Sequence, residues 1–415
     1  YYVNDTGTQI EKLGISLYKR YCQLLKVNIK LKENEYPGKY LIDIANDILK
    51  RDKDKWLNKP KKNIQEYFES FAINSLMTQI KNDLSLIDIK FDTFSYESNI
   101  IKSNLIKKLF LKLKSKNLIY EGVLDKPLGE DVEDWEPRKQ LLFRSSALFD
   151  NSDRAFKKSN GDWTYFANDS AYHYDKYNRK FSKLINIWGA DHIGYIPRMK
   201  SLVYSITDDK NYLEILTCQI VRLLKNNKVL KMSKREGNFI TLKQVYDSVG
   251  KDALRYFMIS TRSETSIDFD MNKVIVKNKD NPVFYCQYAY ARASSVINKA
   301  KKLNVDYSVI NNKNMDILKY ISSFEWEIIL KIISYPYILE QSSEYREPHR
   351  ITNYLENLSS DFHSFWNKGK DQESLRFINE KNVEKTKAKL LWLESMRIVL
   401  KNAFEIIGIE SPESM

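Results

Sequence analysis

The segment from Lys231 to Asn238 contains the residue types best suited to chemistry on a charged substrate. It reads K-M-S-K-R-E-G-N, so Lys231 and Lys234 lie three residues apart, with Ser233 between them and Gly237 just beyond. A lysine ammonium is a point charge on a flexible stem, and a glycine leaves the backbone free to move. The two lysines can therefore surround a polyanion. A solvated basic turn is the alternative, which a bare K-x-x-K would favour, but the longer string favours the polyanion site.

Polar residues follow two segments that the sequence predicts as strands. The first candidate is Trp163–Ala167, with Asp169 just beyond it, and the second is Leu184–Gly189, followed by Asp191 and His192. Parallel sheets bind ligands at the carboxyl ends of their strands, so these side chains are candidates for one binding site. Asp169 could equally cap a helix, and a lone histidine is more often structural than ligand-binding.

Two tyrosines point to a different kind of ligand. Tyr285 and Tyr288 lie three residues apart on one face of a predicted helix, with Arg292 one turn further along. Exposed aromatic faces stack on unpaired bases of RNA, and an arginine is suited to a phosphate. The alternative is a buried aromatic stripe that packs against another helix.

The elements that must position these residues change character along the chain. Residues 1–35 are predicted as a strand end followed by a helix, and residues 36–125 as mainly helical with an apolar i, i+4 stripe. Residues 126–230 alternate between strands and helices, one helix covering Asp169–Arg179. This alternation favours a parallel, doubly wound α/β sheet.

From Thr241 the pattern becomes helical. Thr241 and Gln244 fit a capping box, and Gly250 suits the position just after a helix. Asp252 is placed to cap the next helix, Ala253–Ile259. The rest of the chain is predicted as several amphipathic helices joined by short loops.

The composition restricts the function classes. At 415 residues the chain should hold about two or three domains. Its net charge of +13 favours a polyanionic partner, although a Lys- and Asn-rich genome would give the same excess. Cys22, Cys218 and Cys286 lie too far apart to indicate a disulfide framework or a structural zinc site. No membrane span or signal peptide is visible, so a cytoplasmic location is expected.

Several of these segments, in order, resemble one protein family. Lys231–Asn238 resembles the mobile ATP-binding KMSKS loop of class I aminoacyl-tRNA synthetases. Gly250–Tyr256 contains the D-A-L-R string that names a helical anticodon-binding domain of arginyl- and cysteinyl-tRNA synthetases. Lys279–Arg292 is similar to the start of that domain in bacterial arginyl-tRNA synthetases. Tyr1–Ile10 and Ile406–Met415 also resemble arginyl-tRNA synthetases, so the likeness covers nearly the whole chain.

The resemblance implies a domain organisation. A Rossmann-like catalytic domain would cover residues 1–240, without its first part and with a mainly helical connecting region at 36–125. Linking helices would follow at 241–278. An all-α, DALR-type anticodon-binding bundle would occupy residues 279–415.

The resemblance also implies roles in binding ATP. Lys234 would stabilise the charge of the leaving pyrophosphate, with Lys231, Met232 and Ser233 in the same ATP site. His192 would face the nucleotide.

In the family, a tyrosine and an aspartate four residues apart hold the arginine side chain, and they map to Tyr165 and Asp169. A carboxylate suits the planar, always charged guanidinium. Asp191 stands where many relatives have a glutamine near the α-amino group of arginine, and its carboxylate could bind the α-ammonium. Asn4 and Asp5 would line the same cavity, or else serve as turn and helix-cap residues.

For the helical part, the resemblance implies that Tyr285, Tyr288 and Met415 surround an anticodon base, while Arg292 contacts a phosphate. The activity implied is ATP-dependent conversion of L-arginine to arginyl-adenylate, followed by transfer to tRNA(Arg). Mg²⁺ would enter with ATP, without a protein metal site, and the chain is expected to be a monomer.

Two alternatives and one departure accompany this interpretation. A cysteinyl-type synthetase would share the D-A-L-R domain, but the scattered cysteines argue against it. A non-catalytic tRNA-binding module is disfavoured by the 231–238 loop and by the pair Tyr165 and Asp169. The family's H-x-G-H turn is absent from these residues, and the chain begins at Tyr1 rather than Met. We therefore expect a fragment whose ATP site is completed upstream and which is inactive alone.

Overall fold

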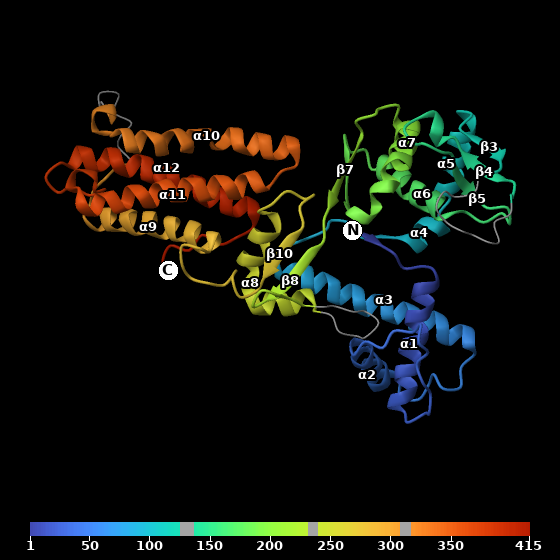
Figure 1. Cartoon of the computed structure of the whole chain (residues 1–415). Helices are drawn as coiled ribbons and strands as arrows, with labels where there is room; N and C mark the ends of the chain where they lie inside the picture. Colours follow the sequence, from blue (N-terminus) through green and yellow to red (C-terminus); the bar gives the residue numbers. More distant parts are fainter. Residues whose placement is uncertain (125–136, 231–239, 308–316) are drawn as a thin grey trace. The chain divides into compact units, whose positions relative to one another are not determined.

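The computed structural model describes residues 1–124, 137–230, 240–307 and 317–415 (Figure 1). These residues form two compact units, each described by itself below. Unit 1 contains residues 1–82, 90–124 and 137–220, and unit 2 contains residues 83–89, 221–230, 240–307 and 317–415. None of the helices that the structure describes is both long and apolar enough to cross a membrane.

Unit 1 begins with a short strand and a helical region. Helices α1 and α2 pack through fully buried residues such as Leu17, Tyr21 and Leu41. Helix α5 buries Leu109 and Leu113 on one side, which confirms the predicted i, i+4 stripe. The mainly helical character predicted for residues 36–125 is also confirmed. The elements up to α5 are β1 (Tyr2–Val3), α1 (Thr8–Leu24), α2 (Tyr40–Asp52), α3 (Lys61–Leu86), β2 (Ser95–Tyr96), α4 (Glu97–Lys102) and α5 (Leu105–Ser115).

The remainder of unit 1 mixes parallel and antiparallel strands. Strand β6 pairs in parallel with β7, and α7 makes the crossover between them; β1 likewise pairs in parallel with β2. The predicted strand Leu184–Gly189 is confirmed as β6. The antiparallel sheet β3–β4–β5 adds a feature that the alternating pattern did not predict. These elements are β3 (Ile119–Gly122), β4 (Gln140–Phe143), the 3₁₀ turn η1 (Ser145–Ala147), β5 (Arg154–Lys157), α6 (Tyr165–Asn178), β6 (Leu184–Gly189), the 3₁₀ turn η2 (Ala190–Tyr195), α7 (Ile196–Thr207) and β7 (Leu213–Cys218).

The predicted strand over Trp163–Ala167 is wrong. Only Trp163 makes a β-bridge, and α6 begins at Tyr165. The Thr164 hydroxyl accepts a hydrogen bond from the N–H of Ala167 at 3.2 Å, so Thr164 is the helix cap. A capping hydroxyl thus outweighs the β-propensity of the aromatic residues around it.

Unit 2 opens with a small sheet and a bent helix. Strand β8 pairs in parallel with β10 and antiparallel with β9. Helix α8 begins with the predicted capping box of Thr241 and Gln244 and is interrupted at Gly250, whose φ is 79°. Both predictions are confirmed. The elements are β8 (Val221–Lys225), β9 (Lys228–Val229), α8 (Leu242–Ile259) and β10 (Ile267–Asp270).

The prediction that Asp252 caps the second half of α8 is wrong, because Gly250, not Asp252, is the residue with non-helical backbone angles. Its carboxylate instead accepts hydrogen bonds from Gln287 Nε2 at 2.7 Å and from the N–H of Glu410 at 3.2 Å. The residue therefore ties α8 to two distant segments of unit 2.

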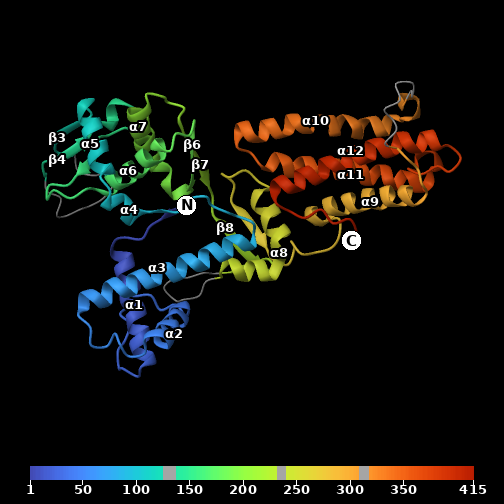
Figure 2. The same cartoon turned by 180° about the vertical axis from the view of Figure 1, so that it is seen from behind.

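The rest of unit 2 is a bundle of long helices, which confirms the prediction for the carboxyl-terminal region. Figures 1 and 2 show α9, α10, α11 and α12 side by side. Their shared core includes the fully buried side chains of Leu355, Phe362, Leu393 and Phe404. These elements are α9 (Pro282–Lys302), the 3₁₀ turn η4 (Ile317–Tyr320), α10 (Ser323–Tyr345), α11 (His349–Asp371), the 3₁₀ turn η5 (Glu373–Leu375) and α12 (Val383–Ile407).

Candidate functional site

The first candidate residues lie at the start of α6 in unit 1. Since Tyr165 and Asp169 are four residues apart in this helix, they lie one turn apart on the same face. Tyr165 is 77% exposed. Asp169 lies inside the helix rather than at its cap, so the capping alternative does not apply to it.

A chain of buried polar groups lies behind the Asp169 carboxylate. His173 Nδ1 is 3.3 Å from Asp169 Oδ1 and 2.9 Å from the Asp169 carbonyl oxygen. Asn186, from β6, places its Nδ2 2.8 Å from His173 Nε2, and Lys176 Nζ donates to Asn186 Oδ1 at 2.5 Å. Because the lysine fixes the amide orientation, the amide donates to Nε2, and Nδ1 carries the ring hydrogen that faces Asp169.

The same buried environment affects the lysine at the end of this chain. Burial lowers the pKa of Lys176 to about 8, against the opposing effect of the Asp169 charge. The ammonium contacts the amide of Asn186 rather than the carboxylate of Asp169.

Tyr195, at the end of η2, contacts Asp169 from another direction. Burial raises the pKa of the Tyr195 hydroxyl, and the charge of Asp169, with which it is hydrogen-bonded, raises it further. The hydroxyl therefore stays protonated and donates to the carboxylate. The Tyr195 ring also meets Trp188, with ring centroids 5.9 Å apart, so an aromatic wall adjoins the carboxylate.

A second carboxylate acts on a tyrosine that also senses the charge of Asp169. Glu97, at the start of α4, is only 7% exposed. Burial raises the pKa of the Tyr2 hydroxyl, and the charges of Glu97 and then Asp169 raise it further. When the amide of Asn4 is oriented with its nitrogen towards Glu97, Asn4 Nδ2 donates to Glu97 Oε2 at 3.0 Å. Two carboxylates near one tyrosine are suited to a cationic ligand.

Asp5 differs from these residues because its carboxylate is already engaged. Its two oxygens accept hydrogen bonds from the Ser98 N–H at 2.8 Å and the Ser98 hydroxyl at 2.6 Å, at the start of α4. These contacts favour the turn-and-cap alternative for Asp5.

Asp191 and His192 lie in η2 and face solvent. Their side chains are 80% and 62% exposed, and His192 Nε2 is 3.5 Å from Asp191 Oδ2. His192 also meets the Trp188 ring at 6.3 Å. Neither residue is engaged by the buried chain behind Asp169, and their proposed roles stay predictions.

The ATP-binding residues predicted in the 231–238 loop, which are Lys231, Met232, Ser233 and Lys234, lie outside the described residues. Elsewhere, in the ranges that the structure does describe, no group of three or more His, Cys, Asp and Glu side chains is arranged to hold a metal ion.

In unit 2 the predicted tyrosine pair forms a cluster with residues of α11. The rings of Tyr285 and Tyr288 lie 4.4 and 5.6 Å from that of His363. Arg292 contacts Tyr288 Oη at 3.0 Å and His363 Nδ1 at 3.0 Å. Both tyrosines are half-buried, so part of each surface is available to a ligand and part packs against α11.

His363 is the buried centre of this cluster. Burial lowers its pKa to about 4, and the positive charge of Arg292 contributes in the same direction. At neutral pH the ring is therefore uncharged. Met415, the last residue, is 54% exposed, and the segment before it is attached to α9 where Gln287 Nε2 donates to the Glu410 carbonyl.

Comparison with known proteins identifies the family. Residues 158–270 match the class I tRNA synthetases of the I, L, M and V type, and residues 286–415 match the DALR anticodon binding domain. Over 415 residues the chain is 39% identical to an arginine–tRNA ligase of Ruegeria pomeroyi, covering all of this chain and 71% of that one. The chain belongs to the arginine–tRNA ligase family.

Other members of the arginine–tRNA ligase family agree. The enzyme of Parvibaculum lavamentivorans is 40% identical over 417 residues, with 100% and 72% of the two chains covered. The Thermus thermophilus arginyl-tRNA synthetase structure superimposes with a TM-score of 0.70 at 17% identity, covering all of this chain and 75% of that one, which shows the shared fold. The α/β class I catalytic fold with a helical anticodon-binding domain is thus confirmed, and the cysteinyl-type alternative is set aside.

Sequence reasoning missed most of the residues that surround Asp169. His173 shares a helix with Asp169 at i, i+4 spacing, which was a readable signal. Asn186, Tyr195 and Glu97 come from three other elements, and no spacing in the sequence connects them to Asp169.

Proposed function

We propose that the chain acts in the ATP-dependent attachment of L-arginine to tRNA(Arg), as part of an enzyme whose ATP site is completed upstream, with Asp169 as the residue that binds the arginine side chain. The observation that carries the assignment of Asp169 is its partly exposed carboxylate, which is hydrogen-bonded to Tyr195 and lies 3.3 Å from His173 Nδ1. Neither contact is with a resident guanidinium, and Lys176, which interacts with the Asp169 charge, donates to Asn186 instead, so the carboxylate stays available to a guanidinium.

The remainder of the arginine site follows from the neighbouring carboxylate. Tyr165 lies one helical turn before Asp169 and can cover the flat face of the guanidinium. Glu97, with Tyr2 and Asn4, supplies a second negative group for the α-ammonium end of the substrate. A site with two cation-binding groups suits a ligand that carries two positive charges.

The proposed chemistry needs no covalent bond to the protein. An oxygen of the arginine carboxylate attacks the α-phosphorus of ATP, the bond to the β-phosphate oxygen breaks, and pyrophosphate leaves. A ribose hydroxyl of the tRNA terminus then attacks the arginyl carbonyl and displaces AMP. Lys231 and Lys234 are proposed to stabilise the charge of the departing pyrophosphate, and the remaining rate enhancement comes from positioning.

Unit 2 is proposed to bind the anticodon. Tyr285 and Tyr288 offer partly exposed rings for stacking on unpaired bases. The Arg292 guanidinium, between Tyr288 and His363, supplies positive charge beside them. Met415 remains a candidate for the same base-binding surface.

The arginine site can be tested with Asp169→Asn, which keeps the shape of the side chain and removes its charge. L-Arginine and its neutral analogue L-citrulline are titrated into each protein by calorimetry. The variant should lose about tenfold or more in arginine affinity, because a charge-assisted hydrogen bond contributes about 1.5–3 kcal/mol. Its weak affinity for citrulline should change little. Asp208→Asn, a 74% exposed carboxylate of the same unit, is the matched control. Equal arginine affinity in wild type and Asp169→Asn would exclude Asp169 from the site.

A further inference from the structure

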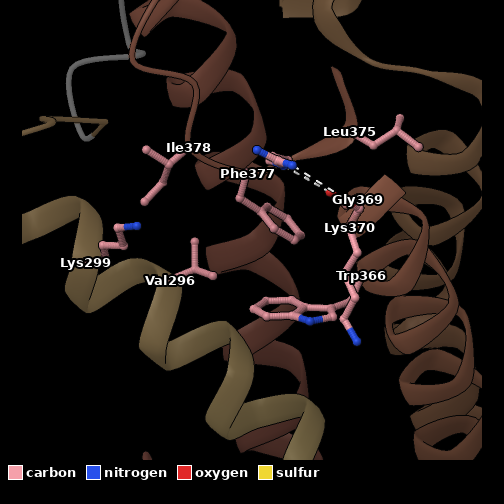
Figure 3. A pocket seen from close by; sticks show the side chains of 9 residues that line it. Val296, Lys299, Trp366, Gly369, Lys370, Leu375, Phe377 and Ile378 are labelled. Atoms are coloured by element: carbon pink, nitrogen blue, oxygen red, sulfur yellow. Dashed lines mark hydrogen bonds between the residues drawn. The ribbon is translucent and has the colours of Figure 1, made fainter. Parts of the chain in front are cut away.

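Three lysines of the helical bundle illustrate how an ammonium is ordinarily accommodated. Figure 3 shows Lys299 and Lys370 at a pocket whose lining includes no carboxylate. Both side chains are exposed, so water solvates their charges. Lys389, in contrast, is buried and pairs with Glu325 at 3.4 Å. A lysine that is removed from water is ordinarily paired with a carboxylate.

Lys176, in α6 of unit 1, fits neither case. Burial lowers its pKa to about 8, against the opposing charges of Asp169 and Asp175. Among the described residues, Lys176 nevertheless forms no ion pair. Its Nζ donates to the amide oxygen of Asn186 at 2.5 Å and lies 4.9 Å from the centroid of the Tyr172 ring. Two neutral groups therefore hold the ammonium, although two carboxylates act on it.

The two carboxylates differ in their own partners. Asp175 is engaged by a resident guanidinium, since Arg179 donates to its Oδ2 through Nη2 at 2.5 Å and Nε at 3.1 Å. Asp169 has no such partner. Because Asp169 and Lys176 are seven residues apart in α6, they lie on the same face two turns apart. A helical side chain points back toward the start of its helix, so the Lys176 ammonium is directed toward Asp169.

The amide of Asn186 is fixed from both ends. The Asp169 carbonyl can only accept, so His173 Nδ1, 2.9 Å away, carries the ring hydrogen and Nε2 is an acceptor. The amide nitrogen of Asn186, 2.8 Å from Nε2, donates to it, and the amide oxygen then faces Lys176. Asn186 is only 6% exposed. This buried oxygen is thus a permanent acceptor for the ammonium.

We propose that Asn186 is a positioning residue for arginine recognition, which holds the Lys176 ammonium away from Asp169 and keeps that carboxylate available to the substrate guanidinium. Asn186 acts through Lys176 and does not itself contact arginine. Without the amide oxygen, the ammonium would turn to Asp169 and compete with the substrate for the carboxylate. This inference rests on the proposed binding of arginine by Asp169.

The test is a cycle of three variants, Asn186→Ala, Lys176→Met and the double variant, in calorimetric titrations with L-arginine. Asn186→Ala should bind arginine about fivefold more weakly than wild type, because the ion pair between Lys176 and Asp169 must first be broken. Lys176→Met should bind at least as tightly as wild type, since the competing cation is gone. The double variant should recover the affinity of Lys176→Met. A merely structural role of Asn186 cannot give this recovery, because the second substitution would then leave or add to the damage.

Asn186→Leu, which nearly keeps the volume of the side chain, replaces Asn186→Ala in the cycle if the alanine variant does not fold. Urea unfolding of the same samples separates stability from affinity, and Asn211→Ala, at an exposed position of unit 1, is the matched control. The proposal is overturned if Asn186→Ala binds arginine as tightly as wild type, if Lys176→Met binds it more weakly, or if the double variant stays as weak as Asn186→Ala. Failure of the proposed arginine site looks different: wild type would not bind arginine, or Asp169→Asn would bind it equally well.

Discussion

The chain of hydrogen bonds behind Asp169 predicts how substitutions of His173 will affect arginine binding. An asparagine at this position can place an amide N–H near the position of Nδ1 and keep the donor to Asp169. A glutamine can reach the position of Nε2 and keep only the partner of Asn186. A leucine keeps neither. If His173 orients the carboxylate, arginine affinity should be similar in wild type and His173→Asn, and lower in His173→Gln and His173→Leu.

The expected size of the effect follows from the geometry. A hydrogen bond to a charged group contributes about 1.5–3 kcal/mol. His173 Nδ1 donates to the Asp169 carbonyl at 2.9 Å and lies 3.3 Å from the carboxylate, whose side chain is 31% exposed, so its contribution to the carboxylate is at or below the lower end of this range. A loss of about 1.4 kcal/mol of binding free energy corresponds to a tenfold larger dissociation constant. Stability should fall separately in His173→Leu, by about 1–3 kcal/mol, because the buried amide of Asn186 loses its partner.

Calorimetric titration of L-arginine measures the affinity, and urea unfolding of the same samples measures stability. The informative comparison is between His173→Asn and His173→Gln, since both keep a polar side chain in a buried site. If the two variants bind arginine equally well while differing from wild type only in stability, His173 supports the fold and does not position Asp169. His192→Leu, at an exposed position, controls for the general effect of losing an imidazole.

Three further outcomes are expected from the structure. Glu325→Ala should destabilise unit 2 by about 3–5 kcal/mol in urea unfolding, because the buried Lys389 ammonium, whose Nζ lies 3.4 Å from Glu325 and whose side chain is 1% exposed, loses its counter-charge. Adding Lys389→Met should recover most of this loss of stability. If the effects of the two substitutions are simply additive, the two residues do not form a pair. The pKa of His363 falls from 6.5 to about 4 on folding, so between these pH values the unfolded state binds more protons than the folded state. Stability should therefore decrease by about 3 kcal/mol as the pH falls through this window. His363→Gln should flatten this part of the plot of stability against pH, and an unchanged slope would refute the lowered pKa of His363. Asp5→Ala should lower the free energy of unfolding by about 0.5–2 kcal/mol, because the hydrogen bonds to Ser98 are lost, and should leave arginine affinity unchanged. A tenfold loss of arginine affinity would instead indicate that Asp5 belongs to the arginine site.

The predicted fold succeeded where local signals acted alone and failed where they competed. Thr241 and Gln244 form a capping box whose chemistry is complete within four residues, so the start of α8 was predictable. At Trp163–Ala167 two local signals disagreed. The aromatic residues favoured a strand, but the hydroxyl of Thr164 also donates to the carbonyl of Ala155 at 2.8 Å. That contact depends on β5, and the sequence contains no sign of it.

The candidate site was predictable to a similar extent. Asp169 was predicted because its distance from Tyr165 matches a family pattern, and Tyr285 and Tyr288 because of their helical spacing; their roles stay predictions. His363 contacts both tyrosines from a position about 75 residues later in the chain. Contacts of this length depend on how helices pack, and helix packing is not encoded in local periodicity.

The way in which Asp169 is held explains why it, rather than another carboxylate of unit 1, is suited to arginine. Asp150 is a useful comparison, because both of its oxygens are taken by Arg154, at 2.7 and 2.8 Å. The charge of Asp150 is already neutralised by Arg154, so the guanidinium of a substrate would have to displace the Arg154 guanidinium. Asp169 lies beside an imidazole and a phenol, and its nearest interacting cation, Lys176, donates to Asn186 and forms no ion pair with it. In a chain with a net charge of +13, which favours a polyanion and repels free arginine, a carboxylate without a resident guanidinium is the local feature that can bind a cationic amino acid.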